Sequence, residues 1–277
     1  MWIVVDSGST KADWALIGQN TKKIISTMGF NPYFHNPEKV YSELTKDDFT
    51  REVPIKEIKN VFFYGAGCSD DYYCSSMKKG LQKVFSSAII EVEHDLLGAA
   101  RATCGHSAGI SGILGTGSNS CSYDGKQVTD NITALSHVLG DEGSGVHLGK
   151  LILQSYFYRE LPEDLESSFN ITYPEGKREI IHRVYGEGQN VKIAEFAQFV
   201  VKNKNHPFIK KLIQQAFREF TQRHLKKYKN WNSLPINLVG SIADMLKEDL
   251  SEVLNTEGLK LGLVIRRPIE KLIDYHS

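Results

Sequence analysis

The same order of predicted strands and helices occurs twice along the chain, and this repeat constrains the fold more than any other feature. In each half, apolar strands come first and helices then alternate with strands. The first half is predicted to have strands at 2–5, 11–18, 22–30, 61–64 and 88–93, and helices at 37–49, from Asp70 or Asp71 through Val84, and at 95–103. This order predicts duplicated α/β lobes with a cleft between them.

The second half is predicted to begin near Ser107. Two strands at 108–118 and 119–129 enclose a glycine-rich turn, and Asp124-Gly125 is typical of a further hairpin. Residues 133–147 are expected to form a loop. A mostly helical stretch follows at 146–229, with breaks near Pro162, Pro174, Gly186 and Pro207, and then a strand at 234–240, a helix at 244–254, a strand at 259–265 and a last helix from Pro268.

Charge and hydropathy exclude several classes of protein. Lys plus Arg and Asp plus Glu both number 33, so the chain is not built to coat nucleic acid, although a small anion needs only a local positive site. The basic stretch at 202–229 has apolar residues at helical spacing and is interpreted as a solvated helix face. No apolar stretch approaches 18 residues, and we expect no membrane contact. The 4 cysteines form no C-x-x-C pair, which favours reduced thiols in a cytoplasmic protein.

Three glycine-rich turns each follow an apolar strand and are candidate phosphate sites. Their backbone N–H groups can point outward with no side chain in the way, and neighbouring hydroxyls add donors. The residues concerned are Gly8, Ser9 and Thr10; Gly115, Thr116, Gly117 and Ser118; and Gly240 and Ser241. Each turn alone is typical of a plain hairpin, and it is the occurrence of three such turns that indicates phosphate binding. The spacings match neither a P-loop nor a Rossmann dinucleotide motif.

Three acidic positions are candidates for chemistry. Asp6 ends a buried strand, where it suits either a Mg²⁺ ion held mostly through water or an Asx-turn. Asp95 follows the strand at 88–93 and is expected to be a helix N-cap, a general base, or both. Asp141 and Glu142 lie in "LGDEGSG", a flexible acidic loop that can bind sugar hydroxyls, while Asp141 or Ser144 alternatively caps the next helix.

Five motifs together resemble one family. "VVDSGSTKADW", "HDLLGAARA", "GILGTGSNS", "LGDEGSG" and "LVGSIA" occur in the order of the sugar kinase, heat-shock ATPase and actin superfamily. The chain most resembles the N-acetylglucosamine kinase family, within the BadF/BadG-type ATPase group. The resemblance implies an α/β fold of two ribonuclease-H-like lobes, at 1–107 and 108–265, with ATP and Mg²⁺ in a central cleft. It implies that the helix at 266–277 packs back on the first lobe.

The resemblance also implies residue roles. "DSGSTK", which includes Lys11, is the first phosphate loop, "GTGSNS" is the second, and "VGSIA" lies at the adenosine. Asp95 falls on the catalytic position, and the metal falls to Asp6. The sugar-binding positions fall on Asn31, Gly67, Asp95, Asn119 and Asp141. The chain departs from the family at Leu96 and Leu97 and in its C-terminal "RRPIEKLIDYHS", which leaves the exact sugar open.

Three functions are compatible with the sequence. The first is phosphorylation of an amino sugar, N-acetylglucosamine to its 6-phosphate, with glucosamine, N-acetylmuramic acid or another hexose as other substrates. The second is an ATPase that activates a partner enzyme through an iron–sulfur cluster, for which Cys104 and Cys121 are the nearest ligands. The third is a sugar sensor, but we expect no DNA-binding helix pair ahead of a strand that begins at Trp2. Dimers are common in the family, so a homodimer is expected.

Overall fold

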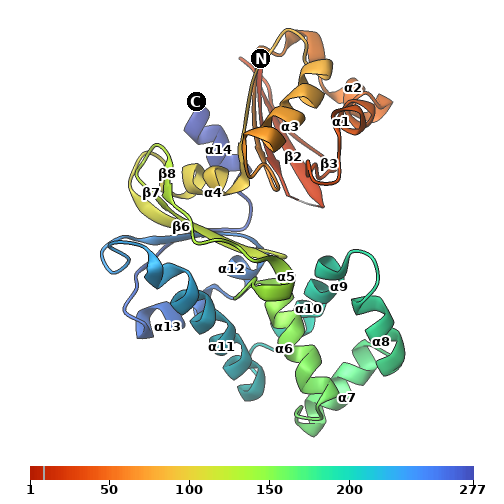
Figure 1. The fold of residues 1–277 in the computed structure, drawn as a ribbon, viewed down its shortest axis with the longest axis vertical. Helices are drawn as coiled ribbons and strands as arrows, with labels where there is room; N and C mark the ends of the chain where they lie inside the picture. The colour runs from red at the N-terminus through yellow and green to blue at the C-terminus, as the bar shows by residue number, and fades with distance from the viewer. Residues whose placement is uncertain (9) are drawn as a thin grey trace. The chain divides into compact units, whose positions relative to one another are not determined.

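Two compact units make up the protein, and each has its own hydrophobic core (Figure 1). The structure, a computed structural model, describes residues 1–8 and 10–277. Unit 1 comprises Met1–Gly105 and Pro268–Ser277, and unit 2 comprises His106–Arg267. The last helix therefore belongs to the unit that contains the N-terminus.

Unit 1 is built on a five-stranded sheet of order β3-β2-β1-β4-β5. Its strands are β1 Trp2–Ser7, β2 Lys11–Ile17, β3 Lys22–Met28, β4 Asn60–Gly65 and β5 Ile89–His94. The first three are antiparallel neighbours, as the alternating pattern at 11–18 predicts, whereas β4 and β5 run parallel to β1. Three strands of this sheet, β1, β4 and β5, consequently end at the same edge.

Successive side chains of β1 point to opposite faces of the sheet, and helices cover both faces. Ile3 and Val5 enter the core beneath α1 (Pro37–Leu44) and α3 (Asp71–Val84). Trp2 lies on the other face, where it contacts His276 of α14 (Ile269–His276). That face also carries α4 (Asp95–Cys104), which packs against α14. By this alternation Asp6 lies on the face of α4.

The predicted helix at 37–49 is wrong as a single element. The structure has α1, which ends at Leu44, followed by α2 (Asp47–Glu52) and the 3₁₀ turn η1 (Ile55–Glu57). The hydroxyl of Thr45 donates to the carbonyl of Tyr41 at 2.8 Å, and Lys46 then turns into an extended conformation. A threonine hydroxyl at a helix end competes for backbone groups, and here it accompanies the end of the helix. In contrast, the prediction for α3 is confirmed, because the Asp70 carboxylate accepts the N–H of Tyr73.

Unit 2 repeats the same sheet topology. Its strands are β6 Gly109–Leu114, β7 Ser118–Tyr123, β8 Val128–Asp130, β9 Ile236–Val239 and β10 Leu261–Ile265. Their order, β10-β9-β6-β7-β8, matches that of unit 1 read from its other edge, with β6, β7 and β8 antiparallel and β9 and β10 parallel to β6. The predicted duplication of α/β lobes of the ribonuclease-H type is confirmed.

Helices make up the middle of unit 2. They are α5 Ser136–Leu139, α6 Gly145–Phe157, α7 Glu163–Thr172, α8 Gly176–Val184, α9 Gln189–Glu195, α10 Ala197–Lys202, α11 Pro207–Arg223, η2 Leu225–Lys227, α12 Ser241–Met245 and α13 Lys247–Thr256. The predicted breaks all fall outside helix interiors. The predicted loop at 133–147 is wrong in part, since α5 and the start of α6 lie within it.

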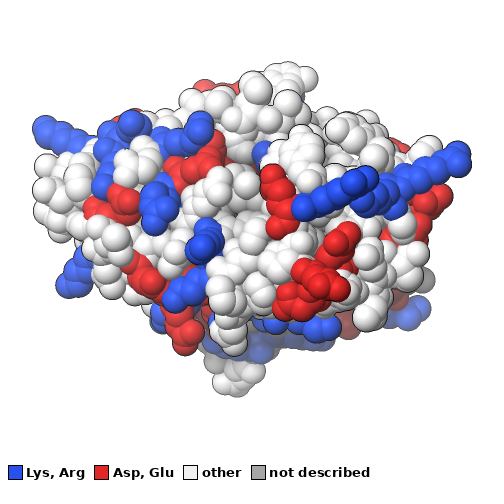
Figure 2. All heavy atoms as spheres, turned by 90° about the horizontal axis from the view of Figure 1, so that it is seen from below, with Lys and Arg blue, Asp and Glu red and all other residues white. Residues whose placement is uncertain are grey.

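The basic stretch at 202–229 forms a helix face that is neutralised by acidic neighbours. Lys210 of α11 pairs with Glu252 of α13 at 2.9 Å, and Lys226 pairs with Glu257 at 2.7 Å. On the face of the molecule seen in Figure 2, basic and acidic side chains are interspersed. Among residues 1–8 and 10–277, no helix combines the length and the apolar composition needed to cross a membrane.

Candidate active site

Three loops of unit 1 meet at the edge where β1, β4 and β5 end. The register places Ser7 beside Gly65, and Gly65 beside His94. The turn after β1, the loop after β4 and the start of α4 are therefore neighbours. In the first of these, Gly8 is exposed and its N–H donates to the carbonyl of Lys11 at 3.0 Å, while Thr10 is also exposed. Ser9, the remaining predicted phosphate ligand of this turn, lies outside the described residues.

Charged residues flank this turn. The Lys11 ammonium lies 2.7 Å from Oδ1 of the buried Asp13, which also accepts the Ser26 hydroxyl. Asp6 lies directly opposite Asp13 in the β1–β2 ladder. No group of three or more metal-ligating side chains occurs in the described part of the chain. A single protein carboxylate, such as that of Asp6, suits a Mg²⁺ ion that keeps most of its waters, because this ion commonly takes only one or two protein carboxylates.

Asn31 and Gly67 lie against each other, although the sequence separates them widely. The Asn31 amide oxygen accepts the N–H of Tyr33 at 3.0 Å, and the Asn31 N–H donates to Nδ1 of His35 at 3.1 Å. Gly67 has φ of +82°, and a Cβ there would lie 2.3 Å from the same amide oxygen. Only glycine fits this position. The two predicted sugar-binding residues thus form one loop contact.

Asp95 is the first residue of α4, and the prediction that it caps this helix is wrong. His94 is the N-cap, because its Nδ1 accepts the N–H of Leu96 at 3.0 Å. β5 ends at His94 and α4 begins directly at Asp95, one residue earlier than a helix capped by Asp95 would begin. The Asp95 side chain keeps 24% of its surface exposed, and its Oδ1 lies 2.7 Å from His94 Nδ1. A partly exposed carboxylate at a helix start is available to a substrate hydroxyl.

In unit 2, the β6–β7 turn meets two helix starts. The carbonyls of Gly115 and Thr116 accept the N–H groups of Gly145 and Val146 at 2.8 and 3.0 Å, which docks α6 on the turn. Thr116 is exposed, and a Cβ at Gly115 would have no neighbour within 4 Å. The turn therefore leaves open space beside its backbone.

The third glycine turn lies directly beside the second. Gly240 has φ of +128°, and a Cβ there would come within 2.2 Å of the Leu114 carbonyl oxygen. Its N–H donates to the carbonyl of Ile265 at 3.0 Å. Ser241, the next residue, is half-buried and begins α12. The structure thus brings together two of the three turns that the sequence predicts to bind ATP.

Ser118 and Asn119 make hydrogen bonds within unit 2. The Ser118 N–H donates to Oδ1 of Asp141 at 3.1 Å, and its hydroxyl oxygen is buried. The Asn119 amide oxygen accepts the Ser120 N–H at 2.9 Å and the Asn131 amide at 3.0 Å. Because the Ser118 N–H already donates to Asp141, it is not available to a phosphate, and its hydrogen bond instead fixes the shape of the turn.

Asp141 joins the acidic loop to the β6–β7 turn. It has φ of +65°, which is unusual for a residue other than glycine, and is 7% exposed. Burial raises the pKa of its carboxyl group above the ordinary value, although the Ser118 N–H and Lys150 act in the opposite direction. The expected flexible loop is in fact buried, and Ser144, the second of the two predicted caps, caps α6 by accepting the His147 N–H.

Comparison with solved structures establishes the family. A candidate N-acetylglucosamine kinase from Porphyromonas gingivalis is 37% identical, with a TM-score of 0.94 over 100% of this chain and 98% of that one. The chain belongs to the N-acetylglucosamine kinase family. A second candidate N-acetylglucosamine kinase, from Chromobacterium violaceum, is 16% identical, with a TM-score of 0.78 over 100% and 98% of the two chains, and shares the fold.

More distant relatives of this N-acetylglucosamine kinase family member share the actin-like sugar kinase fold. A ROK-family glucokinase from Streptomyces griseus, solved with glucose and AMPPNP, is 12% identical, with a TM-score of 0.53 over 98% of both chains. No protein-family profile and no curated protein matches the chain.

A buried contact behind the acidic loop, between Glu142 and His224, has a role that sequence reasoning missed. Nε2 of His224 lies 3.1 Å from Oε2 of Glu142, and both side chains are almost wholly buried. Burial opposes ionisation of Glu142, but the contact with His224, a backbone hydrogen bond and the charge of Arg223 keep its pKa below the ordinary value. Glu142 was expected to bind sugar hydroxyls, whereas here it holds the loop to the end of α11. The sequence signal for this contact was limited to the position of Glu142, a carboxylate next to a glycine.

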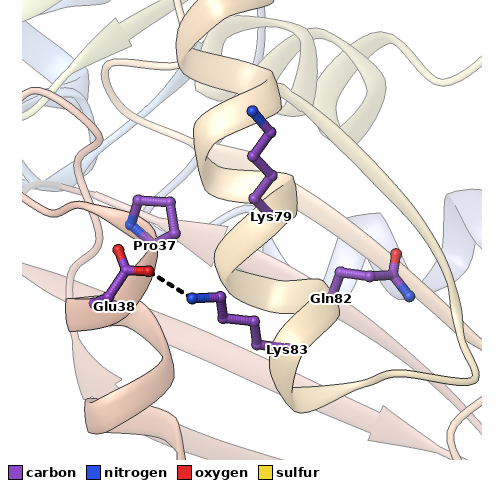
Figure 3. Close-up of a pocket in the computed structure, with 5 residues that line it drawn as sticks. All are labelled: Pro37, Glu38, Lys79, Gln82 and Lys83. Atoms are coloured by element: carbon purple, nitrogen blue, oxygen red, sulfur yellow. Dashed lines mark hydrogen bonds and ion pairs between the residues drawn. The ribbon is translucent and has the colours of Figure 1, made fainter.

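A shallow pocket elsewhere in this N-acetylglucosamine kinase family member is separate from these residues. It lies between α1 and α3 and is lined by Pro37, Glu38, Lys79, Gln82 and Lys83, with Glu38 paired to Lys83 (Figure 3). None of these residues belongs to the candidate site.

Proposed function

We propose that the protein transfers the γ-phosphoryl group of ATP to N-acetylglucosamine and forms N-acetylglucosamine 6-phosphate. The observation that carries this proposal is the placement of Asp95, a partly exposed carboxylate on the first turn of α4 at the strand-end edge of unit 1. Family membership, through a relative 37% identical over the whole chain, supports the same conclusion. Structural similarity to a glucokinase bound to AMPPNP supports the use of ATP.

The glycine-rich turns are proposed to bind ATP. Gly8, Ser9, Thr10 and Lys11 would hold phosphate from unit 1; Gly115, Thr116, Gly117 and Ser118 would do so from unit 2; Gly240 and Ser241 would lie at the adenosine. The exposure of Thr116 and the open space beside Gly115 support this assignment most directly. Ser118 would act by shaping the turn through its bond to Asp141.

Asp6 is proposed to hold Mg²⁺ through water. When bound, Mg²⁺ neutralises charge on the transferring phosphoryl group. Asn31, Gly67, Asn119 and Asp141 are proposed to bind the sugar, and the direct contact between Asn31 and Gly67 supports their acting together.

Asp95 is proposed to act as the general base. It takes the proton of the sugar 6-hydroxyl while the oxygen forms a bond to the γ-phosphorus. The bond between that phosphorus and the β–γ bridging oxygen breaks, and ADP leaves. A positioned base of this kind contributes about 10²- to 10⁴-fold to the rate.

A coupled ADP-release assay with Mg-ATP and a panel of hexoses and amino sugars tests the proposal. We expect N-acetylglucosamine to stimulate ADP release more than glucosamine, N-acetylmuramic acid or glucose does. Stimulation by no sugar would contradict a kinase and favour an activator ATPase. Against that alternative, Cys121, one of its two nearest cluster ligands, is fully buried in unit 2.

The family also supports a cytoplasmic homodimer as the working form of the protein. Light scattering of the purified protein tests the oligomeric state, for which we expect twice the chain mass of 31.1 kDa.

A further inference from the structure

His94 lies directly before the proposed base and contacts its carboxylate. From this contact we propose that His94 and Asp95 share one proton, and that His94 is a positioning residue that controls the charge of the base. The inference rests on the proposed function, because it gives Asp95 the role described above. His94 is not itself expected to touch the sugar.

The contacts of His94 Nδ1 cannot both be ordinary hydrogen bonds of one protonation state. This nitrogen accepts the Leu96 N–H at 3.0 Å, which requires a lone pair on Nδ1. It also lies 2.7 Å from Oδ1 of Asp95, and an ionised carboxylate only accepts. Two acceptors at that distance repel each other unless a proton lies on one of them.

The carboxylate oxygen has no other hydrogen-bond partner. Oδ1 of Asp95 is buried and makes no aligned hydrogen bond with any described group. A buried oxygen without a partner is costly, and a proton on Nδ1 is the nearest source of one. The pair therefore has two arrangements. Either Nδ1–H donates to Asp95, or a protonated Asp95 leaves Nδ1 free to cap Leu96.

These arrangements allow a balanced proton cycle. Before reaction, His94 carries the shared proton and Asp95 is ionised. The sugar hydroxyl gives its proton to Asp95, and the imidazolium, which is 31% exposed, releases its Nδ1 proton to water. The proton on Asp95 then passes to Nδ1 and restores the starting state. One proton enters from the sugar and one leaves to solvent.

The electrostatic surroundings agree with a protonated His94. Burial lowers its pKa, but the hydrogen bond and charge of Asp95 outweigh burial and raise the pKa above the ordinary value. Cys68, in the loop after β4, faces Asp95, and burial raises its thiol pKa so that it stays neutral. Elements packed against α4 also carry Asp6, Tyr64, Glu93, Tyr275 and His276, and the largest effects on the His94 pKa come from burial and from Asp95.

Substitution of His94 by Asn separates proton sharing from helix capping. Asn is among the best N-cap residues, so His94→Asn keeps an acceptor for the Leu96 N–H but cannot hold the proton. In the wild type, we expect kcat to fall as pH rises through the raised pKa of His94, because Nδ1 and Oδ1 of Asp95 are then two acceptors 2.7 Å apart, and their repulsion displaces the base. In His94→Asn we expect unchanged KM values, kcat lower by about 10- to 100-fold at neutral pH, and no such alkaline fall.

His94→Ala is the matched control, because it removes both the proton site and the cap. We expect it to match His94→Asn in kcat and to unfold at a lower temperature. A wild-type kcat and pH profile in His94→Asn would overturn the inference. If the wild type shows no sugar-dependent ADP release, the proposed function itself has failed.

A measurement independent of activity also tests the pair. NMR titration of the imidazole nitrogens of His94 should show a pKa above the ordinary value in the wild type and a lower one in Asp95→Asn. An identical titration in both proteins would overturn the sharing of a proton.

Discussion

Replacing Gly115 with Ala tests whether the β6–β7 turn holds phosphate, because the folded protein has room for the added methyl group. A Cβ at Gly115 meets no heavy atom within 4 Å. The φ angle of Gly115 does not lie in the left-handed region that favours glycine, so Ala fits the backbone. A Gly-to-Ala change at such a position stabilises a protein by about 0.4–1 kcal/mol, through a more restricted unfolded chain. Stability is therefore expected to be kept or to rise.

ATP binding should respond in the opposite direction. If a phosphate approaches the turn, the methyl group occupies part of its space and separates it from a backbone N–H. A hydrogen bond to a charged group contributes about 1.5–3 kcal/mol. Loss of one such bond weakens binding by roughly 10- to 150-fold. Gly115→Ala is therefore expected to keep or raise the stability of the protein while it lowers the affinity for ATP.

Calorimetric titration with a non-hydrolysable ATP analogue and Mg²⁺, together with urea unfolding, measures both quantities. Gly117→Ala is the control in the same turn, because its Cβ would lie 2.8 Å from Oδ1 of Asp141. That overpacking should cost about 1–3 kcal/mol of stability. Wild-type affinity for the analogue in Gly115→Ala would refute the phosphate assignment of this turn.

Two further predictions concern buried ionisable groups. Burial, with Arg101 nearby, lowers the pKa of His276 to about 4, so the unfolded chain binds more protons between that pH and about 6.5. Stability should therefore fall by about 1–2 kcal/mol, after allowance for solvent screening, as pH drops from 7 to 4.5. Urea unfolding should show this loss in the wild type but not in His276→Gln. If the free energy of unfolding depended on pH equally in the two proteins, the prediction would be contradicted. Glu142→Ala should cost about 3 kcal/mol in the same assay, because it leaves His224 buried without its partner, and Glu142→Gln should cost less. Equal stability of Glu142→Ala and the wild type would show that the pair does not hold the loop.

The spacing of apolar residues and the helix-capping residues predicted most of the fold, because both depend on residues that are close together in the sequence. Ala12, Trp14 and Leu16 alternate along β2 and are all buried, as the hairpin prediction requires. The Asp70 cap was likewise visible in the sequence. The break after Leu44 was not, because it depends on how one threonine hydroxyl is used.

The candidate site was predictable in its residue types but not in its contacts. His94 and not Asp95 caps α4, although Asp is on average the stronger N-cap residue, because α4 begins at Asp95, directly after the last residue of β5. The pairing of Glu142 with His224 joins residues that only the tertiary fold brings together. The bond from Ser118 to Asp141 is of the same kind. Such contacts depend on packing, which motif spacing does not encode.

The most direct test of the central claim compares Asp95→Asn with the wild type in one pair of measurements: sugar-dependent phosphorylation followed by phosphorus NMR, and binding of the ATP analogue. We predict that the wild type forms N-acetylglucosamine 6-phosphate, and that Asp95→Asn binds the analogue normally while its kcat falls by about 10²- to 10⁴-fold. Near-normal turnover by Asp95→Asn would contradict the assignment of Asp95 as the base.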